Sequence, residues 1–194
     1  MKIDFSKGAW DTKEITYAYS YRFEQTPTFL QYEDCVGNRK CSEAMYGFEN
    51  ISVLSRAPYL PGTKITTHCS FEDLGAPLIV IADKLDTDER GILRFGNYFE
   101  IVLYKNGINV WQMRYQDGTV TWKKSMSVDF PLAEHKIHTL SVLISAERLE
   151  IEANDRKMSL LVPDLYPSFH VGIDACEGYN RFYDLEIEGP SCSL

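Results

Sequence analysis

The sequence predicts an all-β protein that folds as a sandwich or a barrel. Apolar or alternating segments recur about every 8–15 residues with turn residues between them, which is the strand rhythm of these folds. No segment has the apolar periodicity of an amphipathic helix longer than about three turns. The dipeptides Asn106-Gly107 and Asp117-Gly118 are strong hairpin signals, because both central residues of a type I′ turn need positive φ.

The expected strands follow one another along the chain, each supported by its own alternation or apolar run. They are Thr16–Phe23, Ile51–Arg56, Lys64–Phe71, Leu78–Ala82, three strands within Asn97–Ser127, Ile137–Ser145, Leu149–Ala153, Lys157–Val162, Ser168–Asp174 and Phe182–Glu188. Two short helices are expected at Cys41–Gly47 and Asp129–Glu134, and the polar loops Gln31–Glu43 and Asp83–Gly91 are expected at a rim. At 194 residues, the chain is expected to form one domain, residues 1–194.

The two hairpin signals give an expected register for the three strands between Asn97 and Ser127. A two-residue turn at Asn106-Gly107 predicts the pairs Lys105/Ile108, Tyr104/Asn109, Val102/Trp111, Glu100/Met113 and Tyr98/Tyr115. A two-residue turn at Asp117-Gly118 predicts the pairs Gln116/Thr119, Tyr115/Val120, Met113/Trp122 and Trp111/Lys124. Because side chains alternate, one face then carries an aromatic platform, formed by Tyr98, Glu100, Tyr104, Asn109, Trp111, Met113, Tyr115, Trp122 and Lys124.

The aromatic platform has two interpretations. Trp and Tyr rings stack on the C–H patches of sugars while neighbouring polar groups bind the hydroxyls, so the platform is typical of a carbohydrate site. The core of a β-sandwich can contain the same residues. The opposite face begins as a better core, with Phe99, Ile101, Leu103 and Val110, but continues with the poor core residues Gln112, Arg114, Thr121 and Lys123. A β-bulge near Asn109–Trp111 would reconcile the two patterns by exchanging the faces midway.

Carboxylates suggest an acid–base role at one position. Glu100 is a lone carboxylate among aromatic residues, a setting that raises the pKa of a carboxyl group, and it is the best candidate catalytic acid or base if the protein is an enzyme. A retaining glycosidase needs two carboxyls about 5–5.5 Å apart. Two further rows of carboxylates are expected on solvated outer faces, namely Asp184, Glu186 and Glu188 on one strand and Glu150 and Glu152 on another.

Composition limits the classes of partner. The net charge of −8 disfavours nucleic acid and an anionic membrane surface, since either would select for a basic patch. The first ten residues lack the apolar run of a signal peptide, so a cytoplasmic location is expected. The five cysteines are an odd number without a CxxC motif and are expected to be mostly reduced, although Cys35 and Cys41 are close enough in sequence for a disulfide.

No cofactor is expected. The chain has no phosphate-binding loop, dinucleotide fingerprint or nucleophile elbow. Asp83, Asp86, Asp88 and Glu89 crowd one loop that could hold Ca²⁺, but their spacing matches no known calcium loop, so no metal site is predicted.

The C-terminal third carries a longer pattern. It consists of His138-Thr-Leu-Ser-Val-Leu-Ile, then Arg148-Leu-Glu-Ile-Glu-Ala-Asn-Asp, then a Val171-Gly-Ile strand and a final Arg181-Phe-Tyr-Asp-Leu-Glu-Ile strand. This pattern resembles the concanavalin A-like lectin/glucanase superfamily. The resemblance implies an all-β, two-sheet antiparallel jelly-roll sandwich with a concave face that often grips a glycan. The acid motifs of the glucanases, E-x-D-x-E and E-x-D-x-x-E, do not occur in this chain.

Three functions follow from these observations. The leading hypothesis is lectin-like recognition of an oligo- or polysaccharide on the concave face, stacked on Trp111 and Trp122, with polar contacts from Glu100, Tyr104, Asn109 and, given a bulge, Arg114. The first alternative is a glycoside hydrolase or polysaccharide lyase of the same fold. For a lyase, Tyr104-Lys105-Asn106-Gly107 and Gln112 are loosely similar to an alginate lyase signature whose companion Q-x-H motif is absent. The second alternative is a protein-interaction module without activity.

Overall fold

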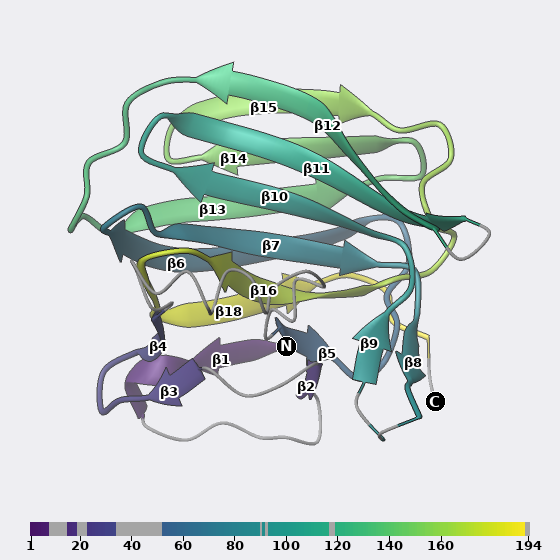
Figure 1. Ribbon diagram of the computed structural model, residues 1–194, viewed down its shortest axis with the longest axis horizontal. Helices are drawn as coiled ribbons and strands as arrows, with labels where there is room; N and C mark the ends of the chain where they lie inside the picture. Colours follow the sequence, from purple (N-terminus) through teal and green to yellow (C-terminus); the bar gives the residue numbers. More distant parts are fainter. Residues whose placement is uncertain are drawn as a thin grey trace.

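The protein is a stack of two antiparallel β-sheets of nine and seven strands, with a small separate hairpin (Figure 1). The computed structural model describes residues 1–7, 15–18, 23–33, 52–89, 91, 93–116 and 119–192. A single 3₁₀ turn, Phe5–Lys7, is the only helical element among these residues. The predicted all-β sandwich is therefore confirmed.

The two large sheets draw their strands from all parts of the chain. The nine-stranded sheet contains β1 (Lys2–Asp4), β3 (Phe23–Gln25), β4 (Leu30–Glu33), β6 (Thr63–Glu72), β13 (His138–Ile144), β14 (Arg148–Ala153), β15 (Arg156–Leu161), β17 (Tyr179–Phe182) and β18 (Asp184–Glu188). The seven-stranded sheet contains β2 (Ile15–Ala18), β5 (Ser52–Ser55), β7 (Ala76–Ala82), β10 (Tyr98–Tyr104), β11 (Gly107–Gln116), β12 (Thr119–Asp129) and β16 (His170–Cys176). The separate hairpin pairs β8 (Leu85–Thr87) with β9 (Leu93–Phe95).

Strand order places sequence-distant segments beside one another. The nine-stranded sheet runs β15-β14-β13-β6-β17-β4-β3, with β18 paired to β6 and β1 paired to β18. The seven-stranded sheet runs β12-β11-β10-β7-β16-β5-β2. Consequently β12 and β15 are the edge strands of their sheets, and β7 and β16 are neighbours although about a hundred residues separate them in sequence.

The main core lies between the two sheets. One face of each strand supplies it, as the alternation of side chains requires. The nine-stranded sheet contributes residues such as Ile65, Phe71 and Val142, and the seven-stranded sheet contributes Ile79, Phe99 and Ile101; these six side chains are at most 1% exposed. The prediction that Phe99, Ile101, Leu103 and Val110 face the core is confirmed.

The register of the first hairpin differs from the prediction by two residues. Tyr104 pairs with Gly107 and Glu100 with Trp111, so Lys105 and Asn106 form the turn. Gly107 has φ +135°, whereas Asn106 does not have positive φ. A type I turn needs no positive φ at its central residues and favours glycine after them, which explains the shift away from the predicted I′ turn. A shift of two residues leaves every side chain on its predicted face.

The register of the second hairpin is confirmed in all four predicted pairs, from Gln116/Thr119 to Trp111/Lys124. The expected bulge near Asn109–Trp111 is present as well, because the register shifts between Val110 and Trp111. The additional residue, Ser125, belongs to β12 and not to β11. Strand β12 therefore exchanges faces at the bulge while β11 keeps its alternation.

Several predicted elements are wrong. Asp129–Glu134 does not form a helix: the amides of Phe130 and Leu132 donate to the carbonyls of Asn106 and Lys105, at 2.9 Å each, so the chain lies against the first hairpin. The loop predicted at 83–91 contains β8, and the loop predicted at 31–43 begins within β4. The predicted strand 16–23 is divided between β2 and β3, which belong to different sheets.

Some expectations lie outside the described residues. These are the helix at Cys41–Gly47, the Cys35–Cys41 disulfide and the central residues of the Asp117-Gly118 turn. Within the described part of the chain, Cys69 and Cys192 are free thiols. In the same part of the chain, no helix has the length and apolar character needed to cross a membrane.

The glycine that ends the first turn should be the least replaceable residue of that hairpin. In Gly107→Ala, the new Cβ would lie 2.0 Å from the carbonyl oxygen of Val128, in addition to the positive φ. We expect the free energy of unfolding to fall by about 3 kcal/mol or more. Gly91→Ala is the control, because Gly91 also has positive φ (+79°) but has no atom within 4 Å of the added Cβ. It should cost only about 1–2 kcal/mol, and equal losses in urea titrations would contradict the structure.

Candidate functional site

A cleft of about 580 Å³ opens on the outer face of the seven-stranded sheet, the face turned away from the main core. We call it the aromatic cleft. It is lined by Leu74, Gly75, Ala76, Glu100, Val102, Tyr104, Lys105, Asn109, Trp111, Trp122, Cys176 and Glu177. Five of the six residues predicted to bind a ligand are among them, so the structure brings together side chains from β10, β11 and β12 as the alternation predicted.

The floor of the aromatic cleft belongs to a second apolar cluster, separate from the main core. Its buried members include Leu78, Val80, Val102 and Met113, and the hairpin β8–β9 adds Phe95 to it. Trp111, Trp122 and Tyr104 pack against this cluster while remaining partly exposed. The core interpretation of the platform therefore applies to Tyr98 and Met113, which are buried, whereas the indoles stand at the border between the cluster and solvent.

The two indoles are held by ring and charge contacts. The ring of Trp122 meets that of Tyr98 edge to face, with centroids 5.8 Å apart and an interplanar angle of 83°. The ammonium of Lys124 lies 4.8 Å from the centroid of Trp111. These contacts fix the ring planes without enclosing them, which leaves apolar aromatic surface available to a ligand.

Glu100 lies on the central strand β10 between Trp111 on one neighbour and Val80 on the other. Its side chain is 5% exposed and makes no hydrogen bond or ion pair to any described residue. Burial raises the pKa of this carboxyl from 4.5 to about 7, as its position among aromatic residues predicted. At neutral pH the group is therefore divided between a neutral acid, which can donate a hydrogen bond, and a carboxylate.

The remaining polar groups lie at the border of the aromatic cleft. The amide oxygen of Asn109 accepts a hydrogen bond from the Ser127 hydroxyl at 2.8 Å, which orients its amide nitrogen as a free donor. Lys105 and Glu177 are exposed and place one charge of each sign at the opening.

Arg114 is the predicted site residue that the structure does not bring to the aromatic cleft. Because the bulge lies on β12, β11 keeps its alternation and Arg114 projects to the opposite face. There it lines a second cleft of about 450 Å³. We call this the sheet-edge cleft; it is lined by Phe99, Gln112, Arg114, Thr121, Lys123 and Ser125 from the seven-stranded sheet and by residues 160–164 from the end of β15 onward.

Sequence reasoning missed the part of the aromatic cleft that β7 and β16 supply. Ala76 pairs with Cys176 in these neighbouring strands, so the turns before β7 and after β16 bring Leu74, Gly75 and Glu177 to one end of the cleft. Gly75 has room for no side chain, since an added Cβ would lie 2.3 Å from the carbonyl oxygen of Tyr179. No local signal could indicate this pairing, because the two strands are distant in sequence.

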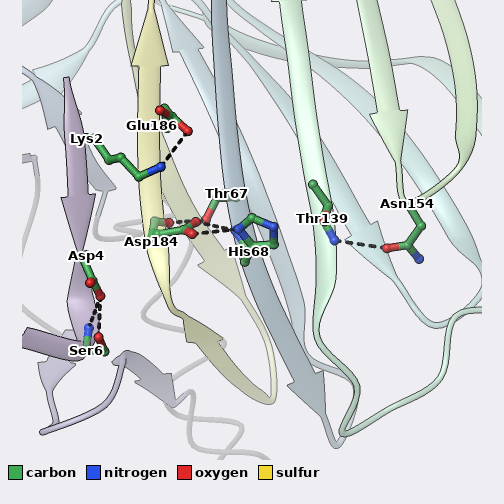
Figure 2. Close-up of polar contacts among 9 residues, drawn as sticks. All are labelled: Lys2, Asp4, Ser6, Thr67, His68, Thr139, Asn154, Asp184 and Glu186. Carbon is green, nitrogen blue, oxygen red and sulfur yellow. Dashed lines mark hydrogen bonds and ion pairs between the residues drawn. The ribbon is translucent and has the colours of Figure 1, made fainter.

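The two other rows of carboxylates lie on the outer face of the nine-stranded sheet, as expected. Figure 2 shows Asp184 beside His68, with 2.7 Å between Oδ2 and the imidazole Nδ1, and Glu186 beside Lys2 at 3.2 Å. The backbone amide of His68 also donates to Asp184 Oδ1 at 2.8 Å. Asp184 is thus fixed by a histidine ring and a backbone amide, and not by a second carboxyl group.

The acidic loop does not assemble a cation site. Asp83 accepts a hydrogen bond from Asn97, Asp86 pairs with Lys84, and Asp88 pairs with Arg94. Across the described residues, no three His, Cys, Asp or Glu side chains form a group that could hold a metal ion. His68 and Cys69 face opposite sides of β6, since Cys69 is buried in the main core.

The sequence matches no protein-family model and no curated protein. Solved structures do match. β-Agarase A from Zobellia galactanivorans is 9% identical with a TM-score of 0.67, covering 97% of this chain and 90% of its own. The carbohydrate-binding module CBM66 from Bacillus subtilis is 13% identical with a TM-score of 0.64, covering 91% and 96%. The Bacillus licheniformis β-glucanase is 10% identical with a TM-score of 0.58, covering 100% and 98%.

These similarities extend over nearly the whole chain and establish the fold. The protein has the concanavalin A-like jelly-roll architecture that its C-terminal third resembles in sequence. The similarity is one of architecture at 9–13% identity. Activity therefore has to be argued from the side chains of the clefts.

The buried carboxyl group should make stability depend on pH. Glu100 has a pKa of about 7 in the folded protein and an ordinary value of 4.5, so between these values the folded state binds more protons. The free energy of unfolding should fall as pH rises through this window, by about 3 kcal/mol in total. Glu100→Gln should therefore gain about 3 kcal/mol relative to the wild type between pH 4 and pH 8. Urea titrations at a series of pH values test this, and parallel pH profiles would contradict it.

Proposed function

We propose that the protein binds a carbohydrate in the aromatic cleft. The observation that carries the proposal is the arrangement of Trp111 and Trp122, two partly exposed indoles that line one open cleft on an outer sheet face. Tyr104, Asn109 and Glu100 line the same cleft and supply polar groups beside the rings.

The chemistry of a sugar suits this lining. A pyranose ring presents flat patches of C–H bonds that stack on aromatic rings, and hydroxyls around its edge that need donors and acceptors. Asn109 offers an amide donor, and the neutral form of Glu100 offers both a donor and an acceptor in a site with little competing water. The cleft volume of about 580 Å³ falls within the usual range for small-molecule sites.

The net charge and the structural neighbours support the same class of ligand. A net charge of −8 repels polyanions and favours an uncharged saccharide. The neighbours include a protein named as a carbohydrate-binding module and others named as an agarase and a glucanase. A lectin-like function agrees with both observations.

Removal of one indole tests binding. In Trp111→Ala, a stacking surface of the aromatic cleft is lost, and we expect affinity for the recognised oligosaccharide, identified on a glycan array, to fall by about tenfold or more. The measurement is calorimetric titration, with thermal unfolding recorded in parallel.

Tyr115→Ala is the matched control. Tyr115 is an aromatic residue on the same strand and the same face, 49% exposed, and it does not line the cleft. It should leave affinity within about twofold of wild type. If Trp111→Ala and the milder Trp111→Phe both keep full affinity, or if no glycan binds, the proposal fails.

Hydrolysis is the second candidate function, and the raised pKa of Glu100 is the observation that favours it. A carboxyl group with a pKa near 7 is suited to protonate a glycosidic oxygen at neutral pH. Glu177 is the other carboxylate among the residues that line the aromatic cleft. It would have to act as the partner base or nucleophile.

Reducing-end release from the bound oligosaccharide tests hydrolysis. If Glu100 is the acid, Glu100→Gln should lower the rate by about a hundredfold or more while binding changes little. Glu177→Gln should then be impaired as well, because both carboxyl groups are needed. Absence of product from a glycan that binds would leave a binding protein without this activity, and wild-type rates in Glu100→Gln would exclude Glu100 as the catalytic acid.

A further inference from the structure

The sheet-edge cleft lies where the two sheets part at their edge strands. One wall comes from the inward faces of β10, β11 and β12, and the other from the end of β15 and residues 162–164. Phe99, only 1% exposed, closes the cleft toward the main core. The poor core residues of this face therefore line a cleft at the sheet edge, beyond the main core. They are Gln112, Arg114, Thr121 and Lys123.

Arg114 is an exposed side chain that lines this cleft and is oriented by a neighbour. Gln112, two residues before it on the same face of β11, is 8% exposed. In the amide orientation that satisfies both side chains, the oxygen of Gln112 accepts hydrogen bonds from Arg114 Nε at 3.0 Å and Nη2 at 2.9 Å. A guanidinium has five N–H donors, so one edge is fixed to Gln112 and the edge formed by Nη1 and Nη2 remains open for a second, bidentate partner.

Cationic charge in the sheet-edge cleft exceeds anionic charge. Arg114 and Lys123 line it from neighbouring strands, and Asp164 is the single acidic residue of the lining. Neither cation forms an ion pair with any described residue. The hydroxyls of Thr121 and Ser125 lie on the same wall as the two cations.

We propose that the sheet-edge cleft is a second binding site, which takes a small sugar acid through its carboxylate. The open edge of Arg114 matches a planar carboxylate, and Lys123 adds a second positive charge. The hydroxyls of Thr121 and Ser125 and the apolar surface of Leu160 and Leu161 suit the remainder of a hydroxylated ring. The net charge of −8 favours a ligand with one carboxylate over a polyanion.

This site is independent of the aromatic cleft, since Arg114 and Trp111 project from opposite faces of β11. A test of binding at the sheet-edge cleft therefore does not decide whether a carbohydrate binds in the aromatic cleft. Trp111→Ala should leave binding at the sheet-edge cleft unchanged.

NMR titration of the full chain with glucuronate, glucose and inorganic sulfate tests the proposal. We expect saturable shifts of the backbone amides of Gln112, Arg114 and Lys123 with glucuronate, no such shifts with glucose, and weaker binding of sulfate. Arg114→Lys keeps the charge and removes the fork of donors, and it should weaken glucuronate binding by about tenfold or more. Lys123→Gln should weaken it as well and provides a second variant.

Lys157→Gln is the charge-matched control. Lys157 is an exposed cation on β15 that pairs with Glu152 and does not line the cleft. It should bind glucuronate as the wild type does. The proposal is overturned if glucuronate leaves the three amides unshifted, if Lys157→Gln weakens binding as much as Arg114→Lys does, or if sulfate binds as tightly as glucuronate.

Discussion

The central strands β7 and β10 are buried on both of their faces, and the character of the aromatic cleft follows from this burial. Every residue of β7 is buried, with Ile79 and Ile81 in the main core and Leu78 and Val80 in the second cluster. Most antiparallel sheets that pack on one side leave the other side to water. Here the outer face carries an apolar cluster as well, and among the described residues the hairpin β8–β9 and the two indoles pack against it.

The position of Glu100 follows from this burial. It occupies the outer face of β10, where its neighbours across the sheet are Trp111 and Val80, and it is almost completely buried. The same apolar surroundings that expose ring surface to a ligand raise the pKa of the carboxyl group. The partly exposed indoles and the raised pKa of Glu100 thus have one cause, the apolar outer face of this sheet.

Sequence signals within a hairpin predicted the features that depend on interactions within that hairpin. The second hairpin has its predicted register, and a bulge lies beside Trp111 as expected, although β12 and not β11 carries the extra residue. The first hairpin was shifted because Gly107 alone takes positive φ, a choice of turn type that the dipeptide Asn106-Gly107 leaves open. Arg114 was assigned to the wrong cleft because the extra residue lies on β12, and the sequence does not say which of two paired strands carries a bulge. The contribution of β7 and β16 depends on long-range pairing that no local pattern encodes.

The proposed carbohydrate site lies in the aromatic cleft, on the outer face of the seven-stranded sheet. Its most direct test is an NMR titration with a bound oligosaccharide that follows the indole N–H groups of Trp111 and Trp122 and the methyl group of Met113, with the methyl groups of Ile65 and Val142 as reporters of the main core. We expect saturable shifts at the two indoles and at Met113, and no shifts at Ile65 and Val142. Saturable binding that leaves both indole resonances in place would contradict the proposed site.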